Sequence, residues 1–330
     1  MSNHDIAIIG AAGFVGSRFA AHLKKRNIFF KQYDINKSSH IDTCKYLDVE
    51  DIGSLDQVCD VSTIINLAAV HRDDVRPLSR YDEVNVQGAS NICNAARKYN
   101  VNKIIFTSSV AIYGFAPAET DESGEPNYFN EYGRTKYLAE QVYIDWQAED
   151  PQNRTLVIVR PTVIFGEGNR GNVYNLLKQI ASRRFVMLGN GKNRKSMAYV
   201  GNVVAFLEHS LTFKQGLHIH NYIDKPDFDM NTLVSKVRKT LFGKDNVGIR
   251  LPFFLGMTIG YFSDFVAKIT GRTLPISSIR VKKFISTTQF ASSLSKTGFV
   301  PPFTLEKGLE QTLHYEFLED NSDKKTFKTE

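Results

Sequence analysis

Short apolar runs alternate with helix-length segments over the first half of the 330-residue chain. The runs are four or five residues long and mostly apolar, which is typical of strands buried on both faces of a parallel sheet. The segments between them, such as residues 15–25 and 86–99, have the length of helices. The predicted strands are Ile6–Ile9, Phe29–Tyr33, Thr63–Leu67, Lys103–Phe106 and Leu156–Val159.

Repeated strand–helix units joined by right-handed crossovers predict an α/β fold with a doubly wound parallel sheet, the Rossmann architecture. This domain is expected to occupy residues 1–165, and the strand and helix predicted within 197–213 return to it. Residues 166–196 and 214–330 have shorter elements and predict a smaller C-terminal α/β lobe. The last ten residues are almost all polar and predict a frayed tail.

Composition excludes several classes of protein. Hydrophobic residues make up 42% and charged residues 23% of the chain, which excludes intrinsic disorder and a fibrous fold. The net charge of +6 is a smaller basic excess than nucleic-acid binders carry, so we expect no nucleic-acid partner. Cys44, Cys59 and Cys93 match no metal-ligand spacing, so we expect no metal site. We expect the three thiols to be reduced and the protein to be cytoplasmic. The N-terminus does not resemble a signal peptide.

Three glycines directly follow the first predicted strand and open the first helix. Gly10, Gly13 and Gly16 form the pattern GxxGxxG. The first glycine permits a tight turn, the second lets the backbone approach a pyrophosphate, and the third lets the helix pack closely on the strand. The helix N-terminus adds N–H donors and a favourable dipole. The pattern predicts a dinucleotide site that includes Phe14 and Val15.

Further cofactor contacts are expected where the next strands end. Asp34 ends the second strand, where its carboxylate can accept both ribose hydroxyls of an adenosine and would repel a 2′-phosphate. NAD is therefore favoured over NADP, and a solvated turn residue is the alternative. Asp48 and Val49 follow the next apolar stretch and can contact the adenine edge. Small residues at the end of the strand predicted from Thr63 let the backbone lie close to a ligand at Leu67, Ala68 and Ala69.

Two segments predict catalytic chemistry. Ser109 lies at the carboxyl edge of the strand predicted at Lys103–Phe106, where open parallel sheets bind ligands. Tyr132 and Lys136 are four residues apart and share one face of a predicted helix. A lysine ammonium beside a phenol lowers the phenol pKa from about 10 towards neutrality, so that Tyr132 can exchange a proton with a sugar hydroxyl near pH 7. A surface helix pair is the alternative.

The glycine pattern, the serine at the strand end and the Tyr-x-x-x-Lys helix follow one another along the chain. In this order they resemble the extended short-chain dehydrogenase/reductase family, in its sugar epimerase/dehydratase branch. The resemblance covers nearly the whole chain. It runs through Gly10–Gly16, Asn85, Ser109, Tyr132, Lys136 and Arg160–Gly166. It implies a tightly held NAD that accepts a hydride from a sugar carbon and leaves a ketone. Relatives in this family are often dimers through a helix pair, which implies a homodimer here.

The same resemblance assigns roles to individual residues. Tyr132 is the acid/base, and Ser109 hydrogen-bonds the reacting hydroxyl of the substrate. Lys136 also binds the nicotinamide ribose, Pro161 joins the cofactor contacts, and Asn85 steadies the helix that carries the site. Dehydratases of the family carry Thr-Asp-Glu at the place of residues 107–109, and this chain has Thr-Ser-Ser. The resemblance therefore implies an epimerase or a ketoreductase, and Asp34 disfavours ketoreduction with NADPH.

The residues expected at the substrate site differ from those of family members that bind UDP-sugars. Val163 stands where those enzymes carry Asn, and Lys195-Ser196 stands where they carry Arg-Asp. A later Arg-x-Gly-Asp is replaced by Arg280-Val-Lys-Lys283. The expected contacts to a diphosphate are Asn172, Arg194, Lys195 and Arg280, with Ser109 and Tyr132 at the sugar. The contacts to uridine that the family would imply are missing.

Residues 251–268 are dense in Phe, Tyr and Leu and have basic residues after them. A spanning helix needs about 20 apolar residues, and Ser263-Asp264 interrupts this segment too early. An interfacial helix with a basic flank fits the pattern, and it predicts peripheral contact with the inner face of the cytoplasmic membrane. Burial in the smaller lobe is the alternative.

Four further segments narrow the resemblance to bacterial 4-epimerases of O-antigen assembly, which act on N-acetylglucosamine joined through diphosphate to undecaprenol. They are His71–Val75, Arg170–Leu177, Lys195–Asn202 and Ser278–Phe284. Such a substrate has no uridine and is met at a membrane, which accounts for both departures. The expected reaction is NAD-dependent C4 epimerisation to N-acetylgalactosamine through a transient 4-keto sugar. A soluble 4-epimerase for UDP-N-acetylglucosamine or UDP-glucose and a non-catalytic NAD(H)-binding protein are the alternatives.

Overall fold

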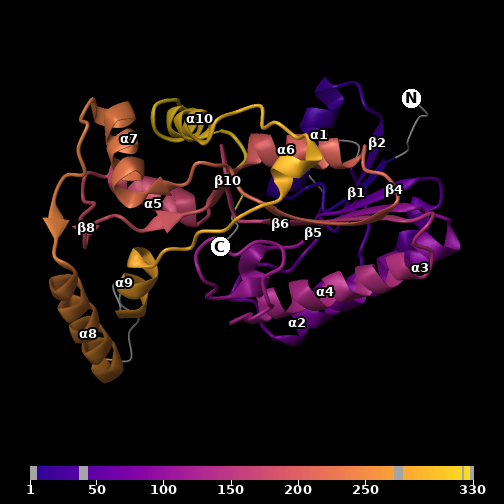
Figure 1. Ribbon diagram of the computed structural model, residues 1–330, viewed down its shortest axis with the longest axis horizontal. Coiled ribbons are helices and arrows are strands. Elements are labelled where there is room, and N and C mark those ends of the chain that lie inside the picture. Colours follow the sequence, from indigo (N-terminus) through magenta and orange to yellow (C-terminus); the bar gives the residue numbers. More distant parts are fainter. Residues whose placement is uncertain (1–5, 37–43, 271–277, 322, 328–330) are drawn as a thin grey trace.

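The computed structural model describes residues 6–36, 44–270, 278–321 and 323–327 (Figure 1). Seven parallel strands form the central sheet in the order β11-β6-β5-β4-β1-β2-β3. They are β1 (Ile6–Ile9), β2 (Phe30–Asp34), β3 (Cys44–Tyr46), β4 (Thr63–Asn66), β5 (Lys103–Thr107), β6 (Thr155–Pro161) and β11 (Gly216–Tyr222). The predicted doubly wound sheet is confirmed.

Helices cover both faces of this sheet because alternate strand residues point to opposite sides. Ile6 and Ile8 pack in one core with α1 (Phe14–Lys25) and α6 (Val200–Ser210). Ala7 and Ile9 pack in the other core with α3 (Gly88–Lys98) and α4 (Glu131–Ala148). Figure 1 shows the two helix pairs on either side of the sheet.

The strand that returns to the sheet differs from the one expected within residues 197–213. β10 (Met197–Tyr199) pairs with β7 (Val163–Phe165) in a separate two-stranded sheet. β11 pairs with β6 instead, from Gly216 opposite Thr155 to Tyr222 opposite Pro161. Because β11 is an edge strand with half-buried His218 and His220 at its centre, it lacks the continuous apolar run of a central strand.

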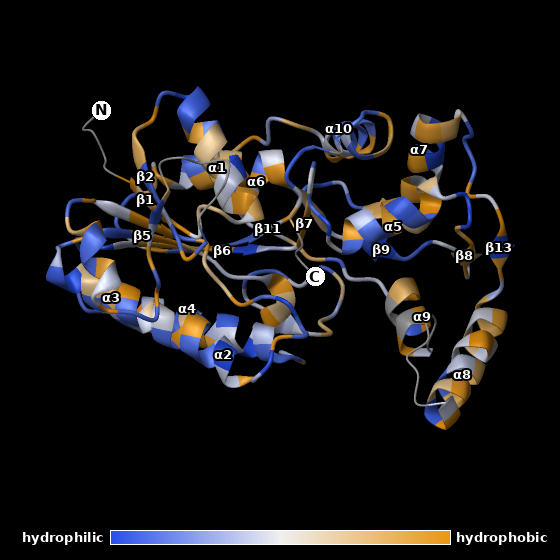
Figure 2. Cartoon of the chain, turned by 180° about the vertical axis from the view of Figure 1, so that it is seen from behind, coloured by the Kyte–Doolittle hydropathy of each residue, from blue (hydrophilic) through white to orange (hydrophobic). Residues whose placement is uncertain are grey.

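The remaining elements form short pairs and the smaller lobe. The short strands are β8 (Met187–Leu188), β9 (Arg194–Lys195), β12 (Phe228–Asp229) and β13 (Arg250–Leu251). The further helices are α2 (Ser79–Tyr81), α5 (Asn172–Ala181), α7 (Met230–Phe242), α8 (Phe253–Thr270), α9 (Ser278–Ile285) and α10 (Leu305–Phe317). Helices α8 and α9 pack on each other and project from the end of the molecule opposite β1 (Figures 1 and 2).

The polar C-terminal segment does not fray over its described residues. The Phe327 N–H donates to the Gly168 carbonyl over 2.8 Å, and the Arg170 N–H donates to the Phe327 carbonyl over 2.7 Å. The Phe327 ring lies 5.6 Å from the Phe14 ring and packs on the main core. The sequence does not predict this contact, because one aromatic residue among polar ones indicates no regular element.

Candidate active site

The turn between β1 and α1 has no room for side chains at two of its glycines. Gly10 has a φ of +85°, and a Cβ there would lie 2.6 Å from the Ala68 nitrogen. A Cβ on Gly16 would lie 2.2 Å from the Gly10 carbonyl oxygen. The turn therefore lies directly against the end of β4, and α1 starts directly against the turn.

Gly13 leaves an open space at the N-terminus of α1. It is exposed, and a Cβ there would contact only the Gly10 carbonyl oxygen, at 3.3 Å. Gly13 is the N-cap residue, no side chain caps the helix, and its first turn contains no acidic residue. The amides of Phe14 and Val15 in this turn suit the pyrophosphate of a dinucleotide.

Asp34 lies beside the same turn. It ends β2, and its carboxylate accepts hydrogen bonds from the Ala12 N–H over 2.9 Å and the Asn36 N–H over 2.8 Å. These bonds fix the carboxylate at the carboxyl edge of the sheet, where it can accept ribose hydroxyls. The glycine turn and Asp34 thus fit NAD, with the pyrophosphate and the adenosine ribose on adjacent parts of one edge.

The other predicted cofactor residues follow the ends of neighbouring strands. The half-buried Leu67, Ala68 and Ala69 follow β4, and the Ala68 N–H donates to the Asn66 side chain over 3.0 Å. Asp48 follows β3 and accepts a hydrogen bond from the Glu50 N–H over 3.0 Å. Val49 is different, because its side chain lies beneath Gly88 of α3 and belongs to the core. Pro161 ends β6 and is buried.

Helix α4 brings Tyr132 to Ser109. The Asn130 side chain caps the helix by accepting a hydrogen bond from the Gly133 N–H over 2.9 Å, so Tyr132 stands in the first turn. A Cβ on Gly133 would lie 2.5 Å from the Ala111 carbonyl oxygen, so α4 packs closely on the residues after β5. This approach places the Tyr132 phenol in a hydrogen bond with the Ser109 hydroxyl.

Lys136 is buried one turn further along α4. Its ammonium donates to the Thr107 carbonyl over 2.7 Å and lies 6.0 Å from the centre of the Tyr132 ring. Burial lowers the pKa of Lys136 to about 7, against a weaker effect of Glu140 that raises it. The structure therefore brings together the three predicted catalytic residues, Ser109, Tyr132 and Lys136.

The expected near-neutral pKa of Tyr132 is not found in the chain alone. Burial raises the pKa of Tyr132 to about 12, the hydrogen bond with Ser109 acts against that rise, and the charge of Asp73 adds to it. Lys136 does not offset burial here, because its own positive charge is destabilised by burial. A near-neutral phenol needs further positive charge at the site.

Asn85 connects the segment after β4 to the N-terminal part of α4. Its side-chain oxygen accepts from the Val70 N–H over 2.8 Å, and its amide donates to the Thr135 hydroxyl over 2.9 Å. Thr135 lies between Tyr132 and Lys136 in the sequence. Asn85 therefore fixes the helix turn that carries both residues relative to the cofactor edge.

A buried ion pair that the sequence patterns did not predict stabilises the same region. The Arg160 guanidinium donates to both oxygens of the Glu140 carboxylate, over 2.9 and 2.6 Å, and to the Tyr113 hydroxyl over 2.6 Å. Tyr113 in turn donates to the Asn221 side chain over 2.9 Å. These bonds join β6, α4 and β11. Glu140 follows Lys136 by one helical turn, and that spacing was the available signal.

The predicted diphosphate contacts lie on elements of the smaller lobe. Asn172 begins α5, Arg194 and Lys195 form β9, and Arg280 belongs to α9, where its side chain lies outside the described part. Lys195 is half-buried, and burial lowers its pKa to about 8. A backbone bridge pairs Lys195 with Thr288, which follows α9. The segment that follows α9 therefore lies beside strand β9.

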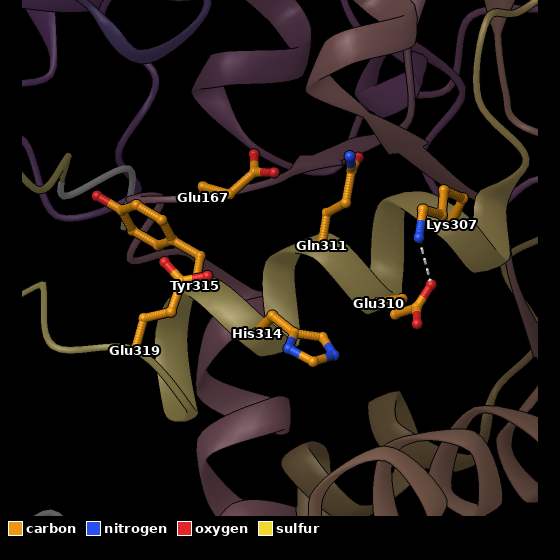
Figure 3. A pocket seen from close by; sticks show the side chains of 7 residues that line it. All are labelled: Glu167, Lys307, Glu310, Gln311, His314, Tyr315 and Glu319. Atoms are coloured by element: carbon orange, nitrogen blue, oxygen red, sulfur yellow. Dashed lines mark hydrogen bonds and ion pairs between the residues drawn. The ribbon is translucent and has the colours of Figure 1, made fainter.

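A cavity of about 520 Å³ on α10 is separate from this site (Figure 3). Its lining contains three carboxylates, Glu167, Glu310 and Glu319, which would repel a phosphate. No residue predicted for catalysis, cofactor or substrate lines it. The cavity is therefore not the catalytic centre.

Known proteins are similar to this chain in sequence and in fold. The model of the NAD dependent epimerase/dehydratase family matches residues 6–222. The N-acetyl-α-D-glucosaminyl-diphospho-ditrans,octacis-undecaprenol 4-epimerase of Escherichia coli O157:H7 is 47% identical over 99% of this chain and 100% of its own length. A UDP-glucose 4-epimerase of Vibrio cholerae is 23% identical over 96% of this chain and 97% of its own.

A solved structure shows the same fold at low identity. UDP-glucose 4-epimerase from Thermotoga maritima, with UDP-glucose, has a TM-score of 0.72 and 20% identity, and the match covers 96% of this chain and 100% of the other. The family model and the full-length relative go further than the fold, since they match the segments that carry Gly10, Ser109, Tyr132 and Lys136. The protein is an NAD-dependent enzyme, and it belongs to the NAD dependent epimerase/dehydratase family.

Proposed function

We propose that the protein is a 4-epimerase that converts N-acetylglucosamine to N-acetylgalactosamine while the sugar is joined through diphosphate to undecaprenol. The 47% identity to the E. coli enzyme with that substrate, over 99% of this chain, carries the proposal. The UDP-glucose 4-epimerase of V. cholerae is only 23% identical over a similar length. A non-catalytic role is disfavoured because Ser109, Tyr132 and Lys136 are brought together at one edge of the sheet.

The residues of the chain supply the proton chemistry. Bound NAD supplies the acceptor for the hydride at C4 of the sugar and the donor that returns it to the opposite face. Tyr132, as phenolate, takes the proton from O4 and later gives it back to the alkoxide. Ser109 hydrogen-bonds the same oxygen. The intermediate is a 4-keto sugar, and no net oxidation results.

Lys136 favours the phenolate form of Tyr132 in this mechanism. Burial, as the largest cause, keeps the pKa of Tyr132 near 12 in the chain alone, so the phenolate needs positive charge close by. The Lys136 amine lies 6.0 Å from the centre of the ring and is fixed by the Thr107 carbonyl. When charged, it stabilises the phenolate more than the phenol, and the phenol pKa falls.

We also propose that the α8–α9 hairpin lies at the cytoplasmic membrane surface. Within the described residues, no helix is both long and apolar enough to cross a bilayer. The exposed apolar side chains of α8 recur at helical spacing, and Met257 and Gly260 face the protein. The exposed residues include Phe254, Tyr261, Phe262, Phe265 and Ile269.

Such a face suits the boundary between head groups and acyl chains, and Lys268 and the exposed Lys282 suit anionic head groups. In Figure 2 the apolar colouring runs along α8 at the projecting end of the molecule. The alternative expectation, burial of this segment in the smaller lobe, does not agree with its exposure. A peripheral position at the inner membrane face would let the enzyme meet a lipid-linked sugar.

A homodimer through a helix pair is a further proposal, and it rests on the family resemblance. Helices α3 and α4 pack together on one face of the sheet and form such a pair. Light scattering of the purified protein tests it, since a monomeric mass at micromolar concentration would rule it out.

The substrate proposal is tested by offering purified protein two substrates in parallel. One is UDP-N-acetylglucosamine, and the other is undecaprenyl-diphosphate-linked N-acetylglucosamine in detergent. The sugars are then released by acid and separated. We expect N-acetylgalactosamine from the lipid-linked substrate only. Product from the nucleotide sugar alone would show that the protein is an epimerase of UDP-sugars. Product from neither substrate would contradict the proposed epimerisation at C4.

A further inference from the structure

The C-terminal segment, residues 323–327, lies against the glycine turn of the cofactor site. The Lys325 ammonium donates to the Ala12 carbonyl over 3.4 Å. The Phe327 ring packs on Phe14, in the first turn of α1. Lys325 and Phe327 are half-buried, whereas Lys324 and Thr326 are exposed. The segment therefore turns alternate side chains towards the turn that holds the pyrophosphate.

The loop after β7 fastens this segment in place. Residue 327 bonds through both its N–H and its carbonyl, to Gly168 and Arg170. Gly168 has a φ of +83°, and a Cβ there would lie 3.2 Å from the Lys325 carbonyl oxygen. The Lys325 ammonium also lies 4.9 Å from the centre of the Phe327 ring. The position of Lys325 is thus fixed by the bonds of residue 327 to this loop and by the contact of its ammonium with the Phe327 ring.

The Lys325 charge lies on the Asp34 side of the turn. Burial raises the pKa of the Cys44 thiol, Asp34 raises it further, and Lys325 lowers it. Both charges are therefore near Cys44, the first residue of β3. The Lys325 ammonium bonds to Ala12, whose own N–H donates to Asp34 and which directly precedes Gly13, the N-cap of α1. The ammonium is therefore close to both the ribose position at Asp34 and the pyrophosphate position at the helix N-terminus.

We propose that Lys325 is a cofactor-binding residue, that it donates a hydrogen bond to a pyrophosphate oxygen of NAD, and that residues 323–327 slow the release of the cofactor. An ammonium–phosphate bond is charge-assisted and stronger than a neutral hydrogen bond. Retention suits an epimerase, since the hydride returns to the sugar and the cofactor need not leave between turnovers. The segment lies outside residues 6–222, the part that the family model matches.

The test is the rate of NAD release from Lys325→Gln. Protein purified with bound NAD is diluted into alcohol dehydrogenase and ethanol, and NADH absorbance records each released molecule. We expect release from the variant to be roughly tenfold faster than from the parent. The matched control is Lys324→Gln, because the Lys324 ammonium lies over the Tyr315 ring, at 5.2 Å, and is exposed. Its release rate should equal that of the parent.

Two further measurements keep the result interpretable. Phe327→Ala loosens the segment without changing charge, so it should also speed release. Raised salt should speed release from the parent more than from Lys325→Gln, because it screens the lysine charge. Release from Lys325→Gln at the parental rate would overturn the proposal, and slower release would mean that the segment competes with NAD. No sugar is present, so the outcome does not depend on the proposed substrate.

Discussion

Burial controls the proton chemistry of Tyr132 and Lys136 in opposite directions. It raises the pKa of the phenol to about 12 and lowers that of the ammonium to about 7. Both shifts favour the neutral form, as expected for groups moved away from water. Near pH 7 the Tyr132 phenol is therefore neutral, and Lys136 changes readily between its charged and neutral forms.

Lys136→Met should stabilise the NAD-free protein at pH 7. The folded-state pKa of Lys136, about 7, is below its ordinary value of 10.5, so the unfolded chain binds more protons between these values. The stability linked to Lys136 is fully present above pH 10.5 and is lost as the pH falls towards 7. The advantage of the variant should thus shrink by roughly 2 kcal/mol between pH 7 and pH 9.

Urea unfolding at both pH values measures this change. The exposed Lys178→Met on α5 controls for loss of a lysine charge. A stability difference between Lys136→Met and the parent that stays constant from pH 7 to pH 9 would contradict the shifted pKa.

Tyr132→Phe should lower turnover by roughly 10²- to 10⁴-fold, the range typical of a lost general acid–base group. The fold should remain, because the variant loses a hydroxyl and one hydrogen bond with Ser109. Release of N-acetylgalactosamine from the lipid-linked substrate measures the effect. Tyr137→Phe, on the same helix, is the control and should keep parental turnover. Turnover of Tyr132→Phe near the parental rate would remove the assigned acid/base.

At the scale of elements, two glycines of the β1–α1 turn have different roles: Gly16 is needed for close packing, and Gly13 for cofactor binding. Gly16→Ala places a Cβ 2.2 Å from the Gly10 carbonyl oxygen, and such overpacking costs about 1–3 kcal/mol. Gly13→Ala meets only an atom at 3.3 Å, and its φ of −72° suits alanine. We expect Gly16→Ala to lower both the melting temperature and the bound NAD, and Gly13→Ala to lower bound NAD alone. Equal melting temperatures for the two variants would contradict this difference.

The α8–α9 hairpin should bind anionic vesicles through its exposed aromatic face. The double substitution Phe262→Ser and Phe265→Ser should weaken binding to phosphatidylglycerol vesicles at least tenfold, because burial of each phenylalanine contributes roughly 1.5–3 kcal/mol. Sedimentation with vesicles measures it. Phe29→Ser is the matched control, since Phe29 is 60% exposed, similar to 67% for Phe262, and lies outside the hairpin. Unchanged binding of the double variant would place the membrane contact elsewhere.

Sequence patterns predicted elements well where burial is continuous. The runs at β1, β4, β5 and β6 were found because both sheet faces are covered. Edge strands such as β11 face water and have mixed polarity, so the pattern did not distinguish them. The hydrogen bonds of Phe327 to Gly168 and Arg170 join segments far apart in the sequence, and no local pattern encodes them.

At the scale of the whole molecule, the predicted catalytic residues lie just after the end of β5 and in the first two turns of α4. Sequence motifs located Gly10, Asp34, Ser109, Tyr132 and Lys136, because each has a fixed place at a strand end or helix start. Motifs could not give the pKa of Tyr132, which depends on its burial and on Ser109 and Asp73, both distant from it in the sequence. The hairpin, at the opposite end from β1, adds a surface that the sheet itself does not offer (Figure 1).

The central claim is that C4 loses a hydride and regains the same hydride. Lipid-linked N-acetylglucosamine with deuterium at C4 tests this most directly, in ordinary water and with no added cofactor. We expect the N-acetylgalactosamine formed to keep the deuterium at C4, as seen by mass spectrometry of the released sugar. Product in which C4 carries hydrogen from the solvent would contradict oxidation and reduction by one bound NAD.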